Sequence, residues 1–176
     1  MPNPKEPITL QDNYKLLFDK SPISIALLDL KGIIIDVNSS TEKLFGYKRE
    51  NIIGKNLTKL YLLAPKEKAP MNKIFTELTK GGIFGPEDIQ IYNKDKNFIW
   101  VNVIAYRIEI GKKFFIQILT QNINEHKLLE RRIEESERRY RGLYESSPFA
   151  LTVTDSNGVI IDVNSATEKI FGFKKS

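Results

Sequence analysis

The amino-acid sequence predicts an α+β fold: a five-stranded antiparallel sheet with short helices on one face, followed by a long helix. Three observations predict it. Two β-rich runs, several short helical patterns and three longer β-rich runs follow one another along the chain. A stretch dense in Glu and Arg, without Pro, comes next. The segment 14–50 then recurs as 140–176, at a constant offset of 126 residues, with about half of the positions identical.

The repeat predicts the domain organisation. A period this long indicates two copies of a whole domain rather than a solenoid of short units. We expect an N-terminal amphipathic helix or cap at 1–20, a complete domain at 21–122, a connector helix at 123–143 and the first part of a second domain at 144–176. Because the second copy lacks three strands of its sheet, we expect its structure to be frayed or to be stabilised by contact with a partner chain.

The first elements are a helix and a hairpin. Apolar residues three to four positions apart predict a short amphipathic helix at 10–20, which ends before Pro22. Two β-rich runs at 23–30 and 33–37 predict a hairpin with Asp29 at its turn.

Short helices follow the hairpin. Ser39 and Glu42 form an S-x-x-E capping box, with Asn38 as a rival cap, and the helix should end at Gly46. Short helical turns are expected over 49–53 and over 56–63, and a longer helix over 70–80. Four residues of that longer helix share one apolar face: Met71, Ile74, Phe75 and Leu78.

Three strands complete the predicted sheet, at about 87–93, 97–108 and 113–120. The middle one is apolar on both faces, and such a strand is normally covered on both. The helices cover one face. The other needs the N-terminal helix, the connector helix or a partner chain, which is a reason to expect a homodimer.

The connector has the spacing of a coiled coil, since Leu129, Ile133, Ser136, Tyr140 and Leu143 follow alternating steps of four and three residues. The seam is short, so dimerisation would also need the outer sheet face; the alternative is a linker helix that lies on its own domain. The predicted dimer surface combines both: Trp100, Ile104, Tyr106, Leu129, Ile133, Tyr140 and Leu143.

Composition narrows the functional classes. The net charge of +5 is spread over scattered Lys residues, which favours a solvated surface over nucleic-acid binding, the alternative. Neither a secretory signal nor an apolar run long enough to span a membrane is present, so we expect no membrane insertion and a cytoplasmic location. The chain has no Cys, which excludes disulfides, thiolate metal sites and cysteinyl adducts.

Nothing in the sequence indicates an enzyme. The acidic residues fall at turns or in the connector rather than in clusters suited to acid–base or metal chemistry. There is no G-x-x-x-x-G-K-[ST] phosphate loop. We therefore expect neither a catalytic nor a metal site.

The order and spacing of several motifs resemble the PAS sensory domains, which often occur in tandem upstream of histidine kinases. The matching residues are Ser21-Pro22, Asp29 with Gly32, Asp36-Val37-Asn38, Glu42 to Tyr47, Ile53-Gly54, Lys94-Asp95-Lys96 before Phe98 to Val101, and Asn122 to Lys127. One departure occurs at the signal junction, where the family usually has Asp-Ile-Thr. Here Asn122 and Asn124 keep the capacity to hydrogen-bond but lose the charge.

The resemblance implies a pocket between the inner sheet face and the helices, whose ligand varies within the family. Haem-binding members supply a His from the helix corresponding to 71–80, which has none here; the only His, His126, should face solvent, or form a pH-sensitive junction element. Cysteinyl flavin needs a Cys, and Ile91, Val101 and Thr120 cannot replace the polar side chains that hold a non-covalent flavin. We expect no cofactor, or an unknown small apolar ligand.

Strand alternation predicts the residues of such a pocket, with Thr120 as its one polar contact; the alternative is that they simply pack together without a cavity. They are Ala26, Leu28, Ile35, Val37, Phe45, Ile74, Leu78, Ile91, Val101, Val103, Ile118 and Thr120.

The resemblance thus implies a sensory and dimerisation module, the input region of a sensor histidine kinase, which signals through its connector helix to an output domain. The alternatives are an input or docking module of a transcriptional regulator and a ligand-free dimerisation scaffold.

Overall fold

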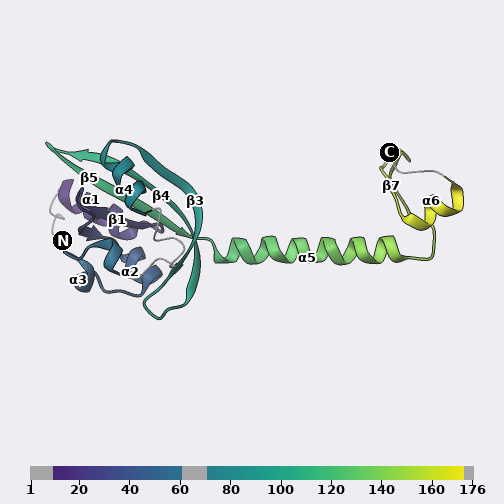
Figure 1. The fold of residues 1–176 in the computed structure, drawn as a ribbon, viewed down its shortest axis with the longest axis horizontal. Helices are drawn as coiled ribbons and strands as arrows, with labels where there is room; N and C mark the ends of the chain where they lie inside the picture. Colours follow the sequence, from purple (N-terminus) through teal and green to yellow (C-terminus); the bar gives the residue numbers. More distant parts are fainter. Residues whose placement is uncertain (1–9, 61–70, 173–176) are drawn as a thin grey trace, which may run out of the picture. The chain divides into compact units, whose positions relative to one another are not determined.

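The computed structural model describes residues 10–60 and 71–172 (Figure 1). It divides into two compact units, Met1–Glu125 and His126–Ser176. The elements of the first unit are α1 (Leu10–Lys20), β1 (Ser24–Leu28), β2 (Ile34–Val37), α2 (Ser39–Phe45), α3 (Arg49–Ile52), the 3-10 helix η1 (Leu57–Leu60), α4 (Met71–Thr79), β3 (Ile83–Tyr92), β4 (Phe98–Ile110) and β5 (Lys113–Asn122). Helix α5 (Asn124–Ser146) begins at its end.

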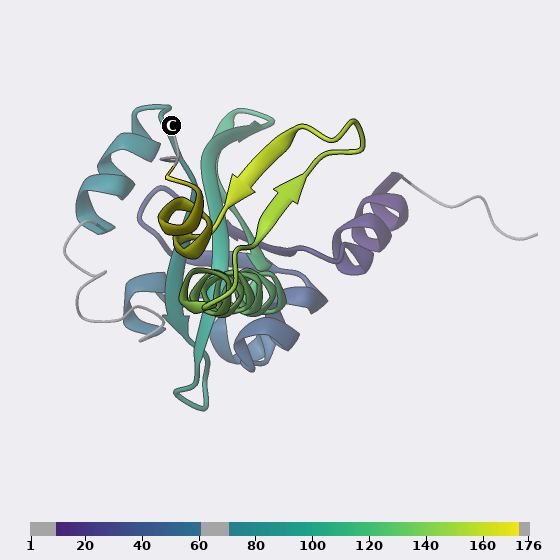
Figure 2. The same ribbon diagram turned by 90° about the vertical axis from the view of Figure 1, so that its right-hand side faces the viewer.

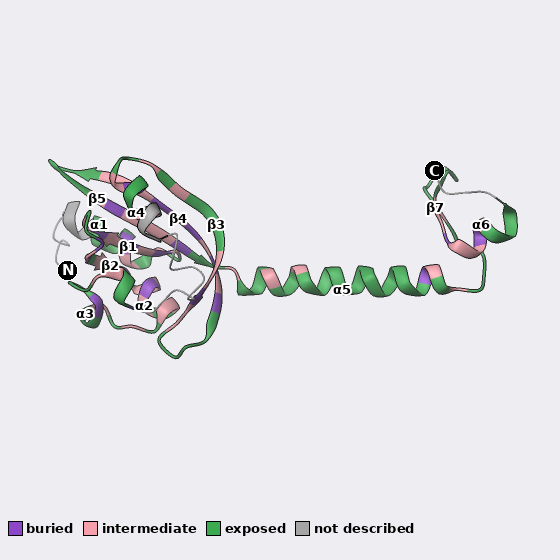
Figure 3. Ribbon diagram, in the orientation of Figure 1, coloured by how far each residue is buried: buried purple, intermediate pink, exposed green. Residues whose placement is uncertain are grey.

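The five strands form one antiparallel sheet in the order β2-β1-β5-β4-β3, so β2 and β3 are its edges, and the first and last strands along the chain, β1 and β5, pair in its interior. This confirms the predicted α+β fold. The buried residues of β4 and β5 lie in the middle of the sheet (Figure 3). Together with residues from β1, β2, α3, η1 and α4 they form the apolar core.

Helix α1 matches the predicted bounds and lies against α2, where the backbone oxygen of Phe18 accepts a hydrogen bond from Asn38 Nδ2 at 3.0 Å. The predicted cap at 1–20 falls partly outside the described residues, as do the last residues of the turn predicted over 56–63. The side chain of Met71 is likewise outside the description.

Two local predictions are corrected. Asn38, not Ser39, caps α2, because its Oδ1 accepts from Thr41 N at 3.0 Å, while Glu42 turns to the next helix. Strand β3 begins at Ile83, four residues earlier than predicted, because a bulge between Phe84 and Glu87 lets an edge strand carry Gly and Pro.

The second unit contains most of α5, the strands β6 (Thr152–Thr154) and β7 (Ile160–Val163), and α6 (Ser165–Phe171). The two strands form an antiparallel hairpin (Figure 2). Many apolar side chains of the second unit are exposed, including those of Ile160 (62%) and Phe171 (60%). In the first unit the corresponding residues, Ile34 and Phe45, face the core.

No described helix is both long enough and apolar enough to cross a membrane.

Candidate functional site

A cavity of about 280 Å³ lies between the inner face of the five-stranded sheet and the helices that cover it. All five strands contribute to its wall, and residues of α2, α3, η1 and α4 line it on the opposite side. The wall is mostly apolar, as is usual for small-molecule sites.

The structure places nine of the predicted pocket residues on the cavity wall: Ala26, Val37, Phe45, Ile74, Leu78, Ile91, Val103, Ile118 and Thr120. Leu28 and Val101 are fully buried in the core but are not part of the wall.

The placement of Ile35 on the inner face was wrong, because Ile35 is 43% exposed. A bulge interrupts the pairing of β1 with β2, so that Leu27 pairs with Asp36 but Leu28 pairs with Ile34. Ile35 is the extra residue, and strand alternation shifts by one position there. Ile34, which is 2% exposed, takes its place on the cavity wall.

The polar part of the wall is larger than the single Thr120 that was predicted. Ser24 and Thr41 also line the cavity, and all three residues are buried. Ser24 Oγ lies 2.8 Å from Thr41 Oγ1, whereas Thr120 makes no side-chain hydrogen bond with any described residue. Glu87, which is exposed, adds a carboxylate to the lining.

Sequence reasoning missed further wall residues, and some left a signal. Ser24 lies one step of strand alternation before Ala26 and could have been found. Phe84 and Glu87 both reach the wall because of the bulge at Gly85-Pro86, which reads as a turn in the sequence. The remaining missed residues come mainly from helices and strand interiors: Tyr47, Ile52, Leu57, Leu60, Phe75, Ile89 and Ala105.

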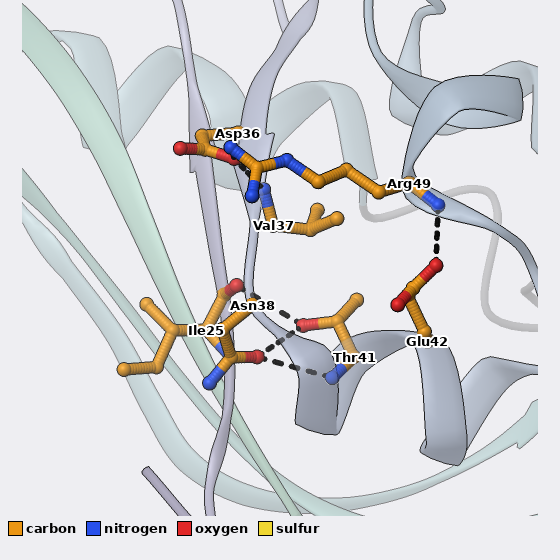
Figure 4. Close-up of polar contacts among 7 residues, drawn as sticks. All are labelled: Ile25, Asp36, Val37, Asn38, Thr41, Glu42 and Arg49. Atoms are coloured by element: carbon orange, nitrogen blue, oxygen red, sulfur yellow. Dashed lines mark hydrogen bonds and ion pairs between the residues drawn. The ribbon is translucent and has the colours of Figure 1, made fainter. Parts of the chain in front are cut away.

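A hydrogen-bond network around Asn38 holds the end of the cavity where β1, β2 and α2 meet (Figure 4). Asn38 Oδ1 accepts from Ile25 N at 2.9 Å and from Thr41 N at 3.0 Å. Arg49 joins the neighbouring elements: its guanidinium pairs with Asp36 at 2.6 Å, and its backbone N–H donates to Glu42 Oε1 at 2.8 Å. The hydrogen bonds of Asn38 and the contacts of Arg49 join neighbouring elements, so the fold itself explains why these polar groups are there.

The second unit repeats this network. Asn164 Oδ1 accepts from Leu151 N at 2.9 Å and from Thr167 N at 3.0 Å, at the positions of Ile25 and Thr41 in the first unit. The position of Ser24 differs, since the second unit has Ala150 there. The Asn–Thr framework therefore forms without the serine.

The predicted signal junction joins the end of β5 to the start of α5. Asn124 Oδ1 accepts from Trp100 N at 2.7 Å, and Asn122 Oδ1 accepts from Asn124 N at 2.9 Å. The N–H of Ile123 donates to Trp100 O at 3.0 Å. Both Asn residues are thus used as hydrogen-bond acceptors, and the first turn of α5 is tied to β4 as well as to β5.

The predicted dimer residues on the sheet, Trp100, Ile104 and Tyr106, are half-buried. Ile104 pairs in register with Leu119, which pairs with Ile25, so an apolar row crosses three strands on the outer face. The four predicted residues of α5 are exposed: Leu129, Ile133, Tyr140 and Leu143.

The described residues contain no group of three or more His, Cys, Asp or Glu side chains that could hold a metal ion. His126 is exposed and pairs with Glu130 at 3.1 Å on α5. It belongs to the second unit.

Comparisons with known proteins agree with this architecture. One PAS domain model matches residues 22–125, and another PAS domain model matches residues 138–176. A curated relative, Two-component system protein A of Emericella nidulans, is 29% identical over 123 residues. The match covers 69% of this chain but only 18% of the relative.

Solved structures share the fold. A PAS domain from Colwellia psychrerythraea superposes with a TM-score of 0.55 at 22% identity, covering 66% of this chain and 99% of that one. A domain of a sensory box sensor histidine kinase/response regulator from Geobacter sulfurreducens gives 0.52 at 16% identity, covering 62% and 91%. Because a PAS domain model matches more than half of its length, this chain belongs to the PAS domain family.

Proposed function

We propose that this chain is a non-catalytic sensory and dimerisation module of a signal-transduction protein, the input region of a sensor histidine kinase. In this proposal a small molecule in the cavity is the signal, and α5 carries it to an output domain elsewhere in the protein. The setting would be cytoplasmic. The relatedness to a two-component system protein supports this context, although this chain spans only 18% of that protein's length.

The observation that carries the proposal is the continuity between the cavity and the start of α5. Thr120 on β5 lines the cavity, and the side chain of Asn122, two residues later, accepts a hydrogen bond from the N–H of Asn124. The side chain of Asn124 in turn accepts a hydrogen bond from the N–H of Trp100 on β4. A shift of β5 caused by a ligand would therefore move the first turn of α5, a transition of the small helix-shift type.

The outer sheet face supports the dimer. The apolar row formed by Ile25, Leu119 and Ile104 is half-exposed, and the seam residues of α5 are exposed. A second copy of the chain that packed on either surface would bury apolar side chains. A stable interface needs about 800 Å² from each partner.

Native mass spectrometry of the purified chain tests both parts together, since it reports the mass of the assembly and of any bound small molecule. We expect a dimer that Ile104→Asp converts to a monomer. Ile53→Asp, at an exposed apolar position on another surface, is the matched control and should leave the dimer intact.

The outcomes separate the candidate functions. A dimer with a retained small molecule supports a sensor, and a dimer that never binds one supports a dimerisation scaffold. A wild-type monomer at micromolar concentration would contradict the dimer.

A further inference from the structure

Two residues that carry hydroxyl groups lie opposite each other at one place on the cavity wall. Ser24 on β1 and Thr120 on β5 are direct partners in the antiparallel ladder, and both line the cavity. Directly opposite residues have Cβ atoms about 4.5–5.5 Å apart. Ser24 is 3% exposed and Thr120 is 5% exposed, so the pair is buried in an otherwise apolar surrounding.

The hydroxyl proton of Ser24 is already used in a hydrogen bond within the protein. Thr41 Oγ1 lies 3.0 Å from Ile25 O and 2.9 Å from Asn38 Oδ1, and both of these oxygens can only accept. Thr41 therefore donates its single proton to one of them. If Thr41 donated to Ser24 instead, both of those oxygen pairs would lack a proton, so we assign Ser24 as the donor of the 2.8 Å contact between Ser24 Oγ and Thr41 Oγ1. Ser24 can offer the cavity only an acceptor.

Thr120 is in the opposite situation, because its hydroxyl makes no hydrogen bond with any described residue. No fully buried side-chain oxygen or nitrogen of the described residues is without a partner, so Thr120 Oγ1 must be reached from the cavity. Its proton is free for a ligand. A buried hydroxyl without a partner is costly, and such groups are normally satisfied by a water or another bound molecule.

An acceptor beside a donor is the complement of one hydroxyl group, which can donate to Ser24 and accept from Thr120 through a single oxygen. The described residues of the wall include no Lys, Arg or His that could pair with an anionic group of a ligand. They do include the Glu87 carboxylate, which would repel such a group. Burying an unpaired charge is expensive. The group bound there should therefore be uncharged.

The rest of the cavity suits an apolar body. Phe45, Phe75 and Phe84 contribute aromatic rings to the wall. The volume of about 280 Å³ is roughly twice the ~150 Å³ of a cavity that accommodates one benzene ring.

The second unit indicates that Ser24 is not required by the fold. With Ala150 at the position of Ser24, Thr167 Oγ1 still lies 2.9 Å from Leu151 O and 2.7 Å from Asn164 Oδ1. The serine hydroxyl is an addition to a framework that forms without it.

We propose that the cavity binds an uncharged phenol or alcohol whose single hydroxyl donates to Ser24 Oγ and accepts from Thr120 Oγ1, with its apolar body against the aromatic wall. This proposal rests on the proposed function of the cavity as a ligand site, and it adds the chemical class of the ligand.

The test compares three probes on the whole chain by titration calorimetry: 2-naphthol, 2-methoxynaphthalene, which accepts but cannot donate, and naphthalene, which can do neither. Since one neutral hydrogen bond contributes modestly, we expect 2-naphthol to bind wild type about three- to tenfold more tightly than 2-methoxynaphthalene, and naphthalene to bind weakest. Ser24→Ala should weaken 2-naphthol about three- to tenfold without changing the other two probes. Thr120→Val should weaken 2-naphthol and 2-methoxynaphthalene alike but leave naphthalene unchanged.

Because Ser24→Ala reproduces the residue of the second unit and Thr120→Val conserves shape, both variants should fold; thermal unfolding followed by circular dichroism checks this. Equal affinity of wild type for all three probes would overturn the hydroxyl subsite but leave the cavity as a ligand site. Failure of all three to bind would overturn the subsite and the ligand-binding role together.

Discussion

Asn38 makes five side-chain hydrogen bonds from a position with no exposed surface. Its Oδ1 accepts from the N–H groups of Ile25 and Thr41, and its Nδ2 donates to Phe18 O and Ile23 O. One amide thus joins α1, β1 and α2. The Asn38 amide donates two N–H groups and also accepts through its oxygen, whereas a serine hydroxyl has only one proton to donate.

Asn38→Ala should lower the free energy of unfolding of the first unit by about 3–4 kcal/mol, because several buried polar groups lose their partner at once. Urea unfolding followed by the fluorescence of Trp100 measures this. The matched control is Asn164→Ala, which removes the same network from the second unit. If Asn164→Ala shifted the Trp100 transition as much as Asn38→Ala, the two units would not be independent.

At this scale, the sequence predicted side-chain positions well wherever alternation was regular, as at Ala26 and Val103. It failed at Ile35, because a bulge depends on the pairing of two strands and leaves no mark in the sequence of one. Ser24 could have been found, because it lies in the predicted strand in the same alternation phase as Ala26.

Among the elements, β3 depends on Gly85. Its φ of +83° lies in the left-handed region, and an added Cβ would collide with the carbonyl oxygen of Val103. This close approach forms the bulge that brings both Phe84 and Glu87 to the cavity.

Gly85→Ala should therefore destabilise the first unit by about 3 kcal/mol or more, through backbone strain and the clash with β4. Gly111→Ala is the matched control: its φ is also positive (+65°), but a Cβ there would meet nothing within 4 Å. We expect it to cost about 1–2 kcal/mol, the strain alone. Equal losses in urea unfolding would show that the contact with Val103 is unimportant.

The start of α5 is the second element-scale test. Asn124→Ala removes the acceptor of Trp100 N. The Trp100 amide should exchange with solvent several-fold faster, because a net contribution of about 1 kcal/mol is lost. Asn102→Ala, on the same strand, removes only a side-chain bond to Asp88 and serves as the control. Unchanged exchange at Trp100 in Asn124→Ala would mean that the junction is held by other contacts.

Element types and order were predictable, since the repeat, the turn residues and the periodicity agreed with one another. The bounds of β3 were not, because Gly and Pro normally interrupt strands and only an edge strand with a bulge tolerates them. The capacity of Asn122 and Asn124 to hydrogen-bond was foreseen, but their partners required the structure.

For the whole molecule, comparison of equivalent positions in the two units distinguishes residues that support the fold from residues that are specific to the cavity. Residues that make the same bonds in both units, such as Asn38 and Asn164, serve the fold. The position occupied by Ser24 and Ala150 differs, and the serine lies on the cavity wall. The cavity volume could not have been predicted, because it depends on how far the helices stand from the sheet.

Within its described residues, 126–172, the second unit has a two-stranded sheet, and an isolated hairpin is marginally stable in water. We expect the backbone amides of β7 to exchange within seconds in dilute solution, whereas those of β4 and β5 should be protected for hours. Hydrogen exchange followed by mass spectrometry compares them in one sample. Slow exchange of β7 in a dilute monomer would contradict this expectation.

The central claim is that the contents of the cavity alter the junction between β5 and α5. Ala105 is buried on the cavity wall, so Ala105→Leu would fill part of the space as a ligand would. Hydrogen exchange at the amides of Ile123 and Asn124 measures the consequence, with the turn at Gly111 as the internal control. The account predicts that Ala105→Leu changes exchange at the junction about threefold or more, while exchange at Gly111 stays the same. Unchanged exchange at the junction in a folded Ala105→Leu protein would contradict it.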